Sequence, residues 1–203
     1  MIVKVCGLTN AMDSLTALDA GADALGFNFW SGSSRYVRDT AFFKDLPDDF
    51  WRVGLFVNED PARVRDLMAE HHLDVAQLHK MDSIHGVRIW KAIAVDGPLT
   101  QDRLDQEHRL DQEHVEAIVL DTPAGALEGG TGKVFDWQWA TGLKGKIVLA
   151  GGLDETNVGQ AIQQLKPWAV DACSRLELEP GKKDRNKMRA FIEAARKEFD
   201  AVC

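Results

Sequence analysis

Short apolar runs alternate with amphipathic segments along the whole chain. Eight of these runs are rich in β-branched or aromatic residues, and several are apolar throughout, as strands covered on both faces are. We therefore expect eight buried β-strands. They are predicted over residues 2–6, 24–29, 52–57, 75–79, 88–94, 117–121, 146–150 and 169–173.

Amphipathic helices are predicted in several gaps between the strands, over residues 13–20, 61–71, 156–165 and 184–199. Thr9-Asn10 is a plausible capping region for the first helix, and Asp60 precedes Pro61, which suits a first helical turn. Strands that alternate with helices predict a parallel sheet with right-handed crossovers. The predicted α/β fold is a single (β/α)₈ TIM barrel over residues 1–203, a short chain for this architecture.

A six-residue duplication interrupts this pattern. Arg-Leu-Asp-Gln-Glu-His at 103–108 is repeated immediately at 109–114. Six residues turn an α-helix by about 600°, so the two copies cannot present the same face. We interpret the repeat as a tolerated duplication in an exposed helix; a His/Glu metal cluster involving His108 and His114 is the weaker alternative.

Charge and cysteine content narrow the possible partners. The net charge of −8 argues against general nucleic-acid or anionic-membrane binding, although backbone N–H groups can still hold a small anion. Three cysteines without a close pair predict neither a disulfide scaffold nor a structural zinc site. With no predicted signal peptide and no apolar run long enough to span a bilayer, we expect a cytoplasmic protein.

TIM barrels build their active sites at the carboxyl ends of the strands, and two ionisable residues occupy such positions. Cys6 ends the first predicted strand, and a modest lowering of its pKa would make its thiolate a useful base. Asp121 ends the sixth strand, where partial desolvation would raise its pKa and suit it to donate a proton. Inert packing for Cys6 and loop capping for Asp121 are the common alternatives.

Glycine-rich loops near the same end indicate a phosphate site. One loop contains Gly130, and another contains Gly151 and Gly152 after the seventh strand. Ser174 follows the eighth strand and can present further N–H donors. The loops after strands seven and eight are the usual phosphate site in these barrels, because glycine allows backbone amides to approach an anion closely.

Two more residues carry side chains suited to ligand binding. Arg35 follows a polar loop, and its guanidinium can clamp a carboxylate through paired hydrogen bonds or remain a solvated surface charge. His79 ends the fourth strand and either orients a neighbour by hydrogen bonding or is a satisfied core imidazole.

Taken together, these residues resemble the phosphoribosylanthranilate isomerase family along nearly the whole chain. No single motif is decisive, but their order and spacing are specific. The matching segments are 4–9, 21–27, 34–37, 53–58, 77–79, 120–121, 129–132, 135–137, 149–153, 157–158 and 180–184.

The resemblance implies a barrel of the ribulose-phosphate-binding type that performs an Amadori rearrangement in tryptophan biosynthesis. Asp121 matches the general acid that opens the furanose ring, and Cys6 matches the base that removes the C2 proton. Arg35 corresponds to the group that holds the anthranilate carboxylate. The remaining implied substrate-binding residues are Gln77, His79, Gly130, Gly151, Gly152, Ser174 and Arg175. The resemblance implies a phosphorylated small-molecule substrate, no metal or organic cofactor, and a monomer or homodimer.

Departures from the family pattern leave alternatives open. Arg175 stands where the family has a small residue, so it either strains the phosphate loop or adds charge to it, and Lys80 replaces a usual glycine. A related histidine-pathway barrel isomerase is the nearest alternative, although that family places an aspartate where this chain has Cys6. A non-catalytic barrel that binds phosphate ligands is the alternative from another class.

Overall fold

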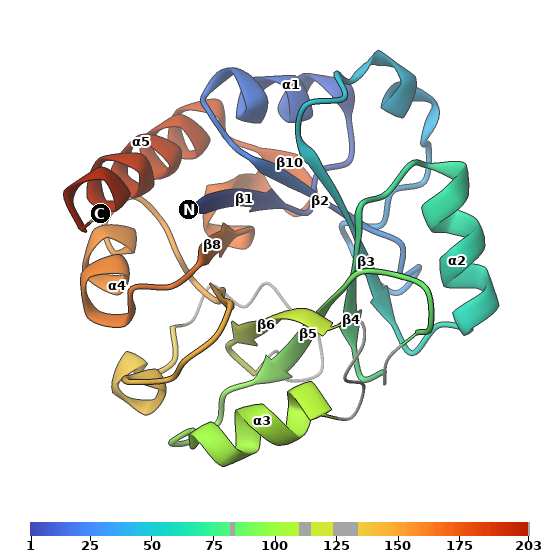
Figure 1. Ribbon diagram of the computed structural model, residues 1–203. Helices are drawn as coiled ribbons and strands as arrows, with labels where there is room; N and C mark the ends of the chain where they lie inside the picture. The colour runs from blue at the N-terminus through green and yellow to red at the C-terminus, as the bar shows by residue number, and fades with distance from the viewer. Residues whose placement is uncertain (82–83, 110–114, 124–133, 203) are drawn as a thin grey trace.

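A computed structural model describes residues 1–81, 84–109, 115–123 and 134–202 (Figure 1). Eight parallel strands pair in sequence order, and the first pairs with the last, so the sheet closes into a barrel. The predicted TIM barrel is confirmed. The strands are β1 Ile2–Cys6, β2 Ala24–Asn28, β3 Trp51–Val57, β4 Val75–His79, β5 Ile89–Ala94, β6 Val115–Asp121, β7 Ile147–Leu149 and β8 Ala169–Ala172.

Two apolar layers hold the barrel together. Small and branched side chains such as Ala24, Val53 and Val119 fill its interior around one large residue, the fully buried Trp90. The rings of Trp51 and Trp168 lie 5.9 Å and 5.6 Å from that of Trp90. Outside the strands, the second layer packs the helices onto the sheet, so both faces of every strand are covered.

The helices begin where their caps predict. Asn10 is the N-cap of α1 Ala11–Asp19, and its Oδ1 accepts the Asp13 N–H at 2.9 Å. Asp60 caps α2 Pro61–Glu70, with Pro61 in the first turn as expected. The other two predicted helices are α4 Val158–Leu165 and α5 Arg185–Val202, the latter covering β1 beside α1.

Several connections contain no full α-helix among the residues that the structure describes, which the alternating pattern did not predict. The connection after β2 contains only the 3₁₀ helix η1 Ala41–Asp45, and η3 Trp137–Ala140 precedes β7. Between β4 and β5, the described residues contain no helix. Of these three connections only the one between β4 and β5, residues 80–88, is short, which helps a chain of 203 residues to close eight strands.

The duplicated hexamer begins in α3 Gln101–Arg109. Leu104 is fully buried while Arg103 is exposed, so the first copy forms an ordinary amphipathic helix against the barrel. The second copy, apart from Arg109, lies outside the described residues, as does any metal cluster built from its side chains. No described helix combines the length and apolarity that a bilayer crossing requires.

A small hairpin follows the last barrel strand. The 3₁₀ helix η4 Ser174–Leu176 leads into β9 Glu177–Glu179, which pairs antiparallel with β10 Lys182–Lys183 before α5 begins. The Thr9 hydroxyl, after β1, donates to the Gly181 carbonyl at 2.7 Å. The hairpin is thereby anchored beside the carboxyl ends of β1 and β8.

Candidate active site

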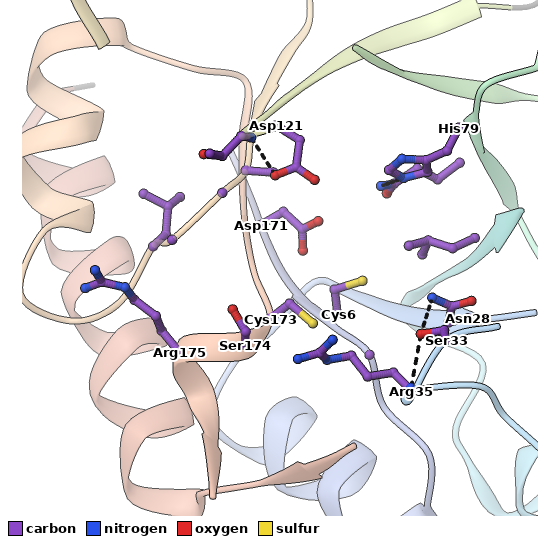
Figure 2. A pocket seen from close by; sticks show the side chains of 18 of the residues that line it. Cys6, Asn28, Ser33, Arg35, His79, Asp121, Asp171, Cys173, Ser174 and Arg175 are labelled. Carbon is purple, nitrogen blue, oxygen red and sulfur yellow. Dashed lines mark hydrogen bonds between the residues drawn. The ribbon is translucent and has the colours of Figure 1, made fainter. Parts of the chain in front are cut away.

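One pocket lies at the carboxyl ends of the strands, where the fold predicts the active site (Figure 2). Its walls come from six of the eight strands, from loops that follow them, and from the loop after β7. The lining residues are Cys6, Gly7, Asn28, Ser33, Arg35, Leu55, Val57, Gln77, His79, Asp121, Thr122, Ala150, Gly151, Gly152, Leu153, Asp171, Cys173, Ser174 and Arg175. Every site residue that the sequence predicted is in this set except Gly130, which lies outside the described residues.

The floor of the pocket holds a buried ion pair that sequence reasoning missed. Lys4 Nζ donates to Asp171 Oδ2 at 2.6 Å, and both side chains are buried. Burial opposes the charge on Lys4, but Asp171 and the nearby Cys6 outweigh it and raise the pKa of the ammonium. The sequence does carry a signal for this ion pair, because each of these two neighbouring apolar strands has one charged residue in its middle.

Cys6 and Cys173 form a coupled pair of thiols above this ion pair. A hydrogen bond between the two sulfurs, with Cys6 as the donor, raises the pKa of Cys6 and lowers that of Cys173 to about 6. Lys183 and Arg35 lower the pKa of Cys173 further, whereas burial raises it. Because interacting groups titrate as a unit, the pair loses its first proton below the usual thiol range and carries one negative charge.

A network of charges from the β9–β10 hairpin surrounds these thiols. Lys183 Nζ lies 3.7 Å from Cys173 Sγ and 2.9 Å from Glu177 Oε1. Glu177 also accepts two hydrogen bonds from Arg35, from Nε at 2.8 Å and from Nη2 at 2.7 Å. This bidentate pair fixes the Arg35 side chain beside the thiols and leaves Nη1 out of the contact. Neither Glu177 nor Lys183 lies at the end of a barrel strand. The position of TIM-barrel active sites at strand ends therefore did not predict them from the sequence.

Asp121 faces the thiols from β6, with Asp171 between them in the view of Figure 2. Desolvation by burial and the charge of Asp171 raise the pKa of Asp121 to about 7, although its Oδ1 accepts the Thr122 N–H at 2.8 Å. The carboxyl therefore keeps its proton to a pH at which an exposed aspartate is ionised. This is the protonation state that a general acid requires.

The loops after β7 and β8 form a concave rim next to Asp121. Gly151 and Gly152 both have positive φ, +85° and +63°. A Cβ on Gly151 would lie 2.8 Å from the Thr122 backbone nitrogen and 3.0 Å from Asp121 Oδ1, so only glycine fits there. Asn157 fixes the loop by donating to the Gly152 carbonyl at 2.9 Å. Such loops present N–H groups to anions.

The two departures from the family pattern have different consequences. Arg175 does not have a positive φ, so backbone strain does not arise there, and its Nη1 contacts Asp154 Oδ2 at 2.5 Å. The ion pair with Arg175 and the hydrogen bonds from Thr156 outweigh burial and lower the pKa of Asp154. Lys80 has a φ of +54°, the left-handed region that favours glycine.

The opposite wall of the pocket is less charged. Gln77 Nε2 lies 3.1 Å from His79 Nε2, so the histidine is engaged with a neighbour. Gln77 Oε1 is buried and has no hydrogen-bond partner among the described residues. Asn28 Nδ2 donates to Ser33 Oγ at 3.1 Å, and the same oxygen accepts the Arg35 N–H, which ties the Arg35 loop to β2 (Figure 2).

Ionisable groups and glycine loops gathered at the carboxyl ends of a closed eight-stranded barrel define a TIM-barrel enzyme. Comparison with known proteins gives the particular family. Residues 3–194 match the family model of N-(5'-phosphoribosyl)anthranilate (PRA) isomerase. The chain belongs to this family.

Individual relatives agree over their full lengths. The N-(5'-phosphoribosyl)anthranilate isomerase of Solibacter usitatus is 42% identical over 205 residues, covering 99% of this chain and 100% of the relative. The crystal structure of the Thermotoga maritima enzyme is 36% identical with a TM-score of 0.83, covering 97% of this chain and 100% of that one. The Thermus thermophilus structure is 31% identical with a TM-score of 0.82, covering 97% and 99%.

The activity follows from the family. The chain is an enzyme that isomerises N-(5'-phosphoribosyl)anthranilate, an aldose-to-ketose conversion within one molecule, in tryptophan biosynthesis. A structure 34% identical to this chain, with a TM-score of 0.78 and covering 97% of this chain and 100% of that one, was solved in complex with reduced 1-(o-carboxyphenylamino)-1-deoxyribulose 5-phosphate.

Proposed function

We propose that Asp121 is the general acid and Cys6 the general base of this isomerisation. The observation that carries the proposal is one pocket with an aspartate whose pKa is about 7 facing a thiol pair that carries a single negative charge. Ring opening needs a proton donor at oxygen, and isomerisation needs a proton acceptor at carbon. The two groups supply these opposite requirements from β6 and β1.

The steps follow from these roles. Asp121 protonates the furanose ring oxygen as the bond from that oxygen to C1 breaks, and the nitrogen lone pair forms the Schiff base. The proton of the thiol pair then passes from Cys6 to Cys173, and Cys6, now the thiolate, removes the proton from C2. The electron pair of that C–H bond moves toward the nitrogen to give an enolamine. Tautomerisation of the enolamine gives the ketone. Each proton-transfer group contributes roughly 10²–10⁴-fold to the rate.

We propose that Arg35 binds the carboxylate of the anthranilate group. Its bidentate pair with Glu177 uses Nε and Nη2, so Nη1 is available to a ligand in the pocket. Gln77 and His79 line the facing wall, and the buried Gln77 Oε1 has no partner among the described residues, which suits it to accept a hydrogen bond from substrate.

The phosphate of the substrate is proposed to bind at the rim formed by Gly151, Gly152 and Ser174. Their positions after β7 and β8 are those at which TIM barrels bind phosphate. Arg175 adds a guanidinium to this rim, held by Asp154, and so contributes charge where backbone amides supply hydrogen bonds. Gly130, which lies outside the described residues, is proposed as a further contact from the resemblance to the family alone.

The cellular location and the oligomeric state of the enzyme are proposed from its free thiols and from its relatives. Cys6 and Cys173 are free thiols on neighbouring strand ends, which supports a reducing, cytoplasmic location. The protein is proposed to act as one domain, as a monomer or a homodimer; the Thermotoga maritima relative is described as dimeric. Its partner is the phosphorylated small molecule on which it acts.

The residue roles are tested by following the fluorescence of phosphoribosylanthranilate generated in the cuvette from anthranilate and phosphoribosyl pyrophosphate. Cys6→Ala and Asp121→Asn are each expected to lower kcat by at least about 10²-fold, because each removes one proton-transfer group. Asp19→Asn, on the exposed face of α1, is the matched control and is expected to keep normal turnover. Near-normal turnover in either site variant would show that its assigned role is wrong.

A further inference from the structure

Cys6 ends β1, and Cys173 directly follows β8, the strand that pairs with β1. The β1–β8 register pairs Lys4 with Asp171 and Val5 with Ala172, so Cys6 and Cys173 are the next residues along each chain. Lys4 and Asp171 touch inside the barrel. Because side chains two positions apart on a strand point to the same face, the Cys6 thiol points inward as Lys4 does. Figure 2 shows both sulfurs in the pocket.

This placement meets the requirements of a disulfide. Neighbouring strands lie about 4.8 Å apart, within the range of about 4.4–6.8 Å between Cα atoms that a disulfide spans. Both residues line the same pocket, beside the seam at which β1 pairs with β8. A bond between them therefore requires side-chain rotation and little movement of the strands.

The surroundings favour reaction at Cys173. Lys183 Nζ lies 3.7 Å from its sulfur, and Arg35 is held nearby by Glu177, so positive charge stabilises the thiolate, the form that reacts with oxidants. Cys173 is partly exposed and lines the pocket, whereas Cys6 is only 4% exposed. A small neutral molecule that enters the pocket meets Cys173 first.

We propose that Cys173 is a modification site for hydrogen peroxide and that its oxidation joins it to Cys6 in a reversible disulfide within the active site. The Cys173 thiolate attacks one peroxide oxygen, the O–O bond breaks, and the products are the sulfenic acid and hydroxide, which takes a proton to become water. The Cys6 sulfur then attacks the Cys173 sulfur, its own proton leaves, and hydroxide departs as a second water. The two thiols supply both electrons that reduce the peroxide.

The disulfide would switch the enzyme off by consuming the thiolate that removes the substrate proton. This consequence rests on the proposed role of Cys6, whereas formation of the disulfide does not. A dithiol reductant restores both thiols, so the inactivation is reversible, unlike further oxidation to a sulfinic acid.

To test this proposal, the full chain is treated with hydrogen peroxide, and the remaining thiols are then blocked with an alkylating reagent. The sample is divided into two portions. One portion is digested and searched by mass spectrometry for a peptide that joins Cys6 to Cys173, and the other is assayed before and after dithiothreitol. We expect the linked peptide to accumulate as activity falls by about 10²-fold, with both changes reversed by the reductant. Cys203→Ser, which removes the third cysteine, is expected to behave like the unmodified chain.

Cys173→Ser is the decisive variant. Measured against its own starting activity, it is expected to form no linked peptide and to show no loss that dithiothreitol reverses. Inactivation of the unmodified chain without the linked peptide would overturn the inference and leave the proposed role of Cys6 untouched. A linked peptide with full activity would instead uphold the disulfide and refute Cys6 as the base.

Discussion

At the scale of single residues, Asp121 sets the expected pH dependence of the activity. As an acid it must hold its proton, and its pKa is about 7, so kcat/KM is expected to fall as pH rises through about 7. The thiol pair must have lost a proton, and the pKa of about 6 assigned to Cys173 places the acidic limb near pH 6. We predict a narrow bell-shaped profile. A profile that stays flat from about pH 7 to about pH 9 would contradict the assignment of Asp121.

The same residue links stability to pH. Unfolded Asp121 would titrate near its ordinary value of about 4, whereas the folded residue keeps its proton to about 7. The folded state binds more protons between these values, so the contribution of Asp121 to the free energy of unfolding is full at low pH and declines as pH rises through 7. A buried carboxyl with a raised pKa therefore lowers the free energy of unfolding at neutral pH relative to low pH.

The sequence predicted those site residues whose position at the end of a strand was informative by itself. Cys6, Asp121, Gly151 and Ser174 were nominated because they stand at strand ends, and the structure places all four in one pocket. The buried pair of Lys4 and Asp171 was missed because its members are 167 positions apart, and only closure of the barrel brings them together.

At the scale of elements, the strands were more predictable than their connections. All eight predicted strands occur, with ends shifted by two residues or fewer, because buried parallel strands leave short, mostly apolar runs in the sequence. The 3₁₀ segments η1 and η3 were not predicted because they are only five and four residues long. Such short segments leave no 3.6-residue periodicity to detect.

The C-terminus of α4 allows a prediction about stability. Lys166 ends this helix in the left-handed conformation, with φ of +45°, and its side chain is exposed. Glycine adopts this conformation without the steric cost, so Lys166→Gly is expected to stabilise the protein by about 1 kcal/mol and to raise Tm by about 2–4 °C.

Thermal unfolding of two variants checks this expectation. Lys166→Ala removes the same side chain but keeps a Cβ, so it is the matched control and is expected to give no comparable gain. Equal Tm values for the two variants would show that left-handed strain at residue 166 is not a significant cost.

At the scale of the whole molecule, the β1–β8 seam closes the barrel, and the Lys4–Asp171 pair lies buried in it. Removing one member leaves the other charge uncompensated. Lys4→Met is therefore expected to lower the free energy of unfolding by about 3–5 kcal/mol, measured by urea denaturation.

An exposed ion pair provides the control for this variant. Lys146 Nζ contacts Glu116 Oε1 at 2.7 Å, but nearly half of the Lys146 side chain is exposed, so Lys146→Met is expected to cost less than about 1 kcal/mol. A loss in Lys4→Met as small as that of Lys146→Met would mean that the seam does not depend on its buried charges.

The hairpin of β9 and β10 lies outside the repeating strand–helix unit, yet it supplies Glu177 and Lys183 to the thiols and orients Arg35. The eight strands therefore close the barrel, whereas a separate stretch of chain, the hairpin, affects the pKa of the active-site thiol. Substitutions within residues 177–183 can retune the reactivity of that sulfur while every strand keeps its register. The reactivity of an active-site thiol in a barrel can in this way change through a segment that takes no part in closing the sheet.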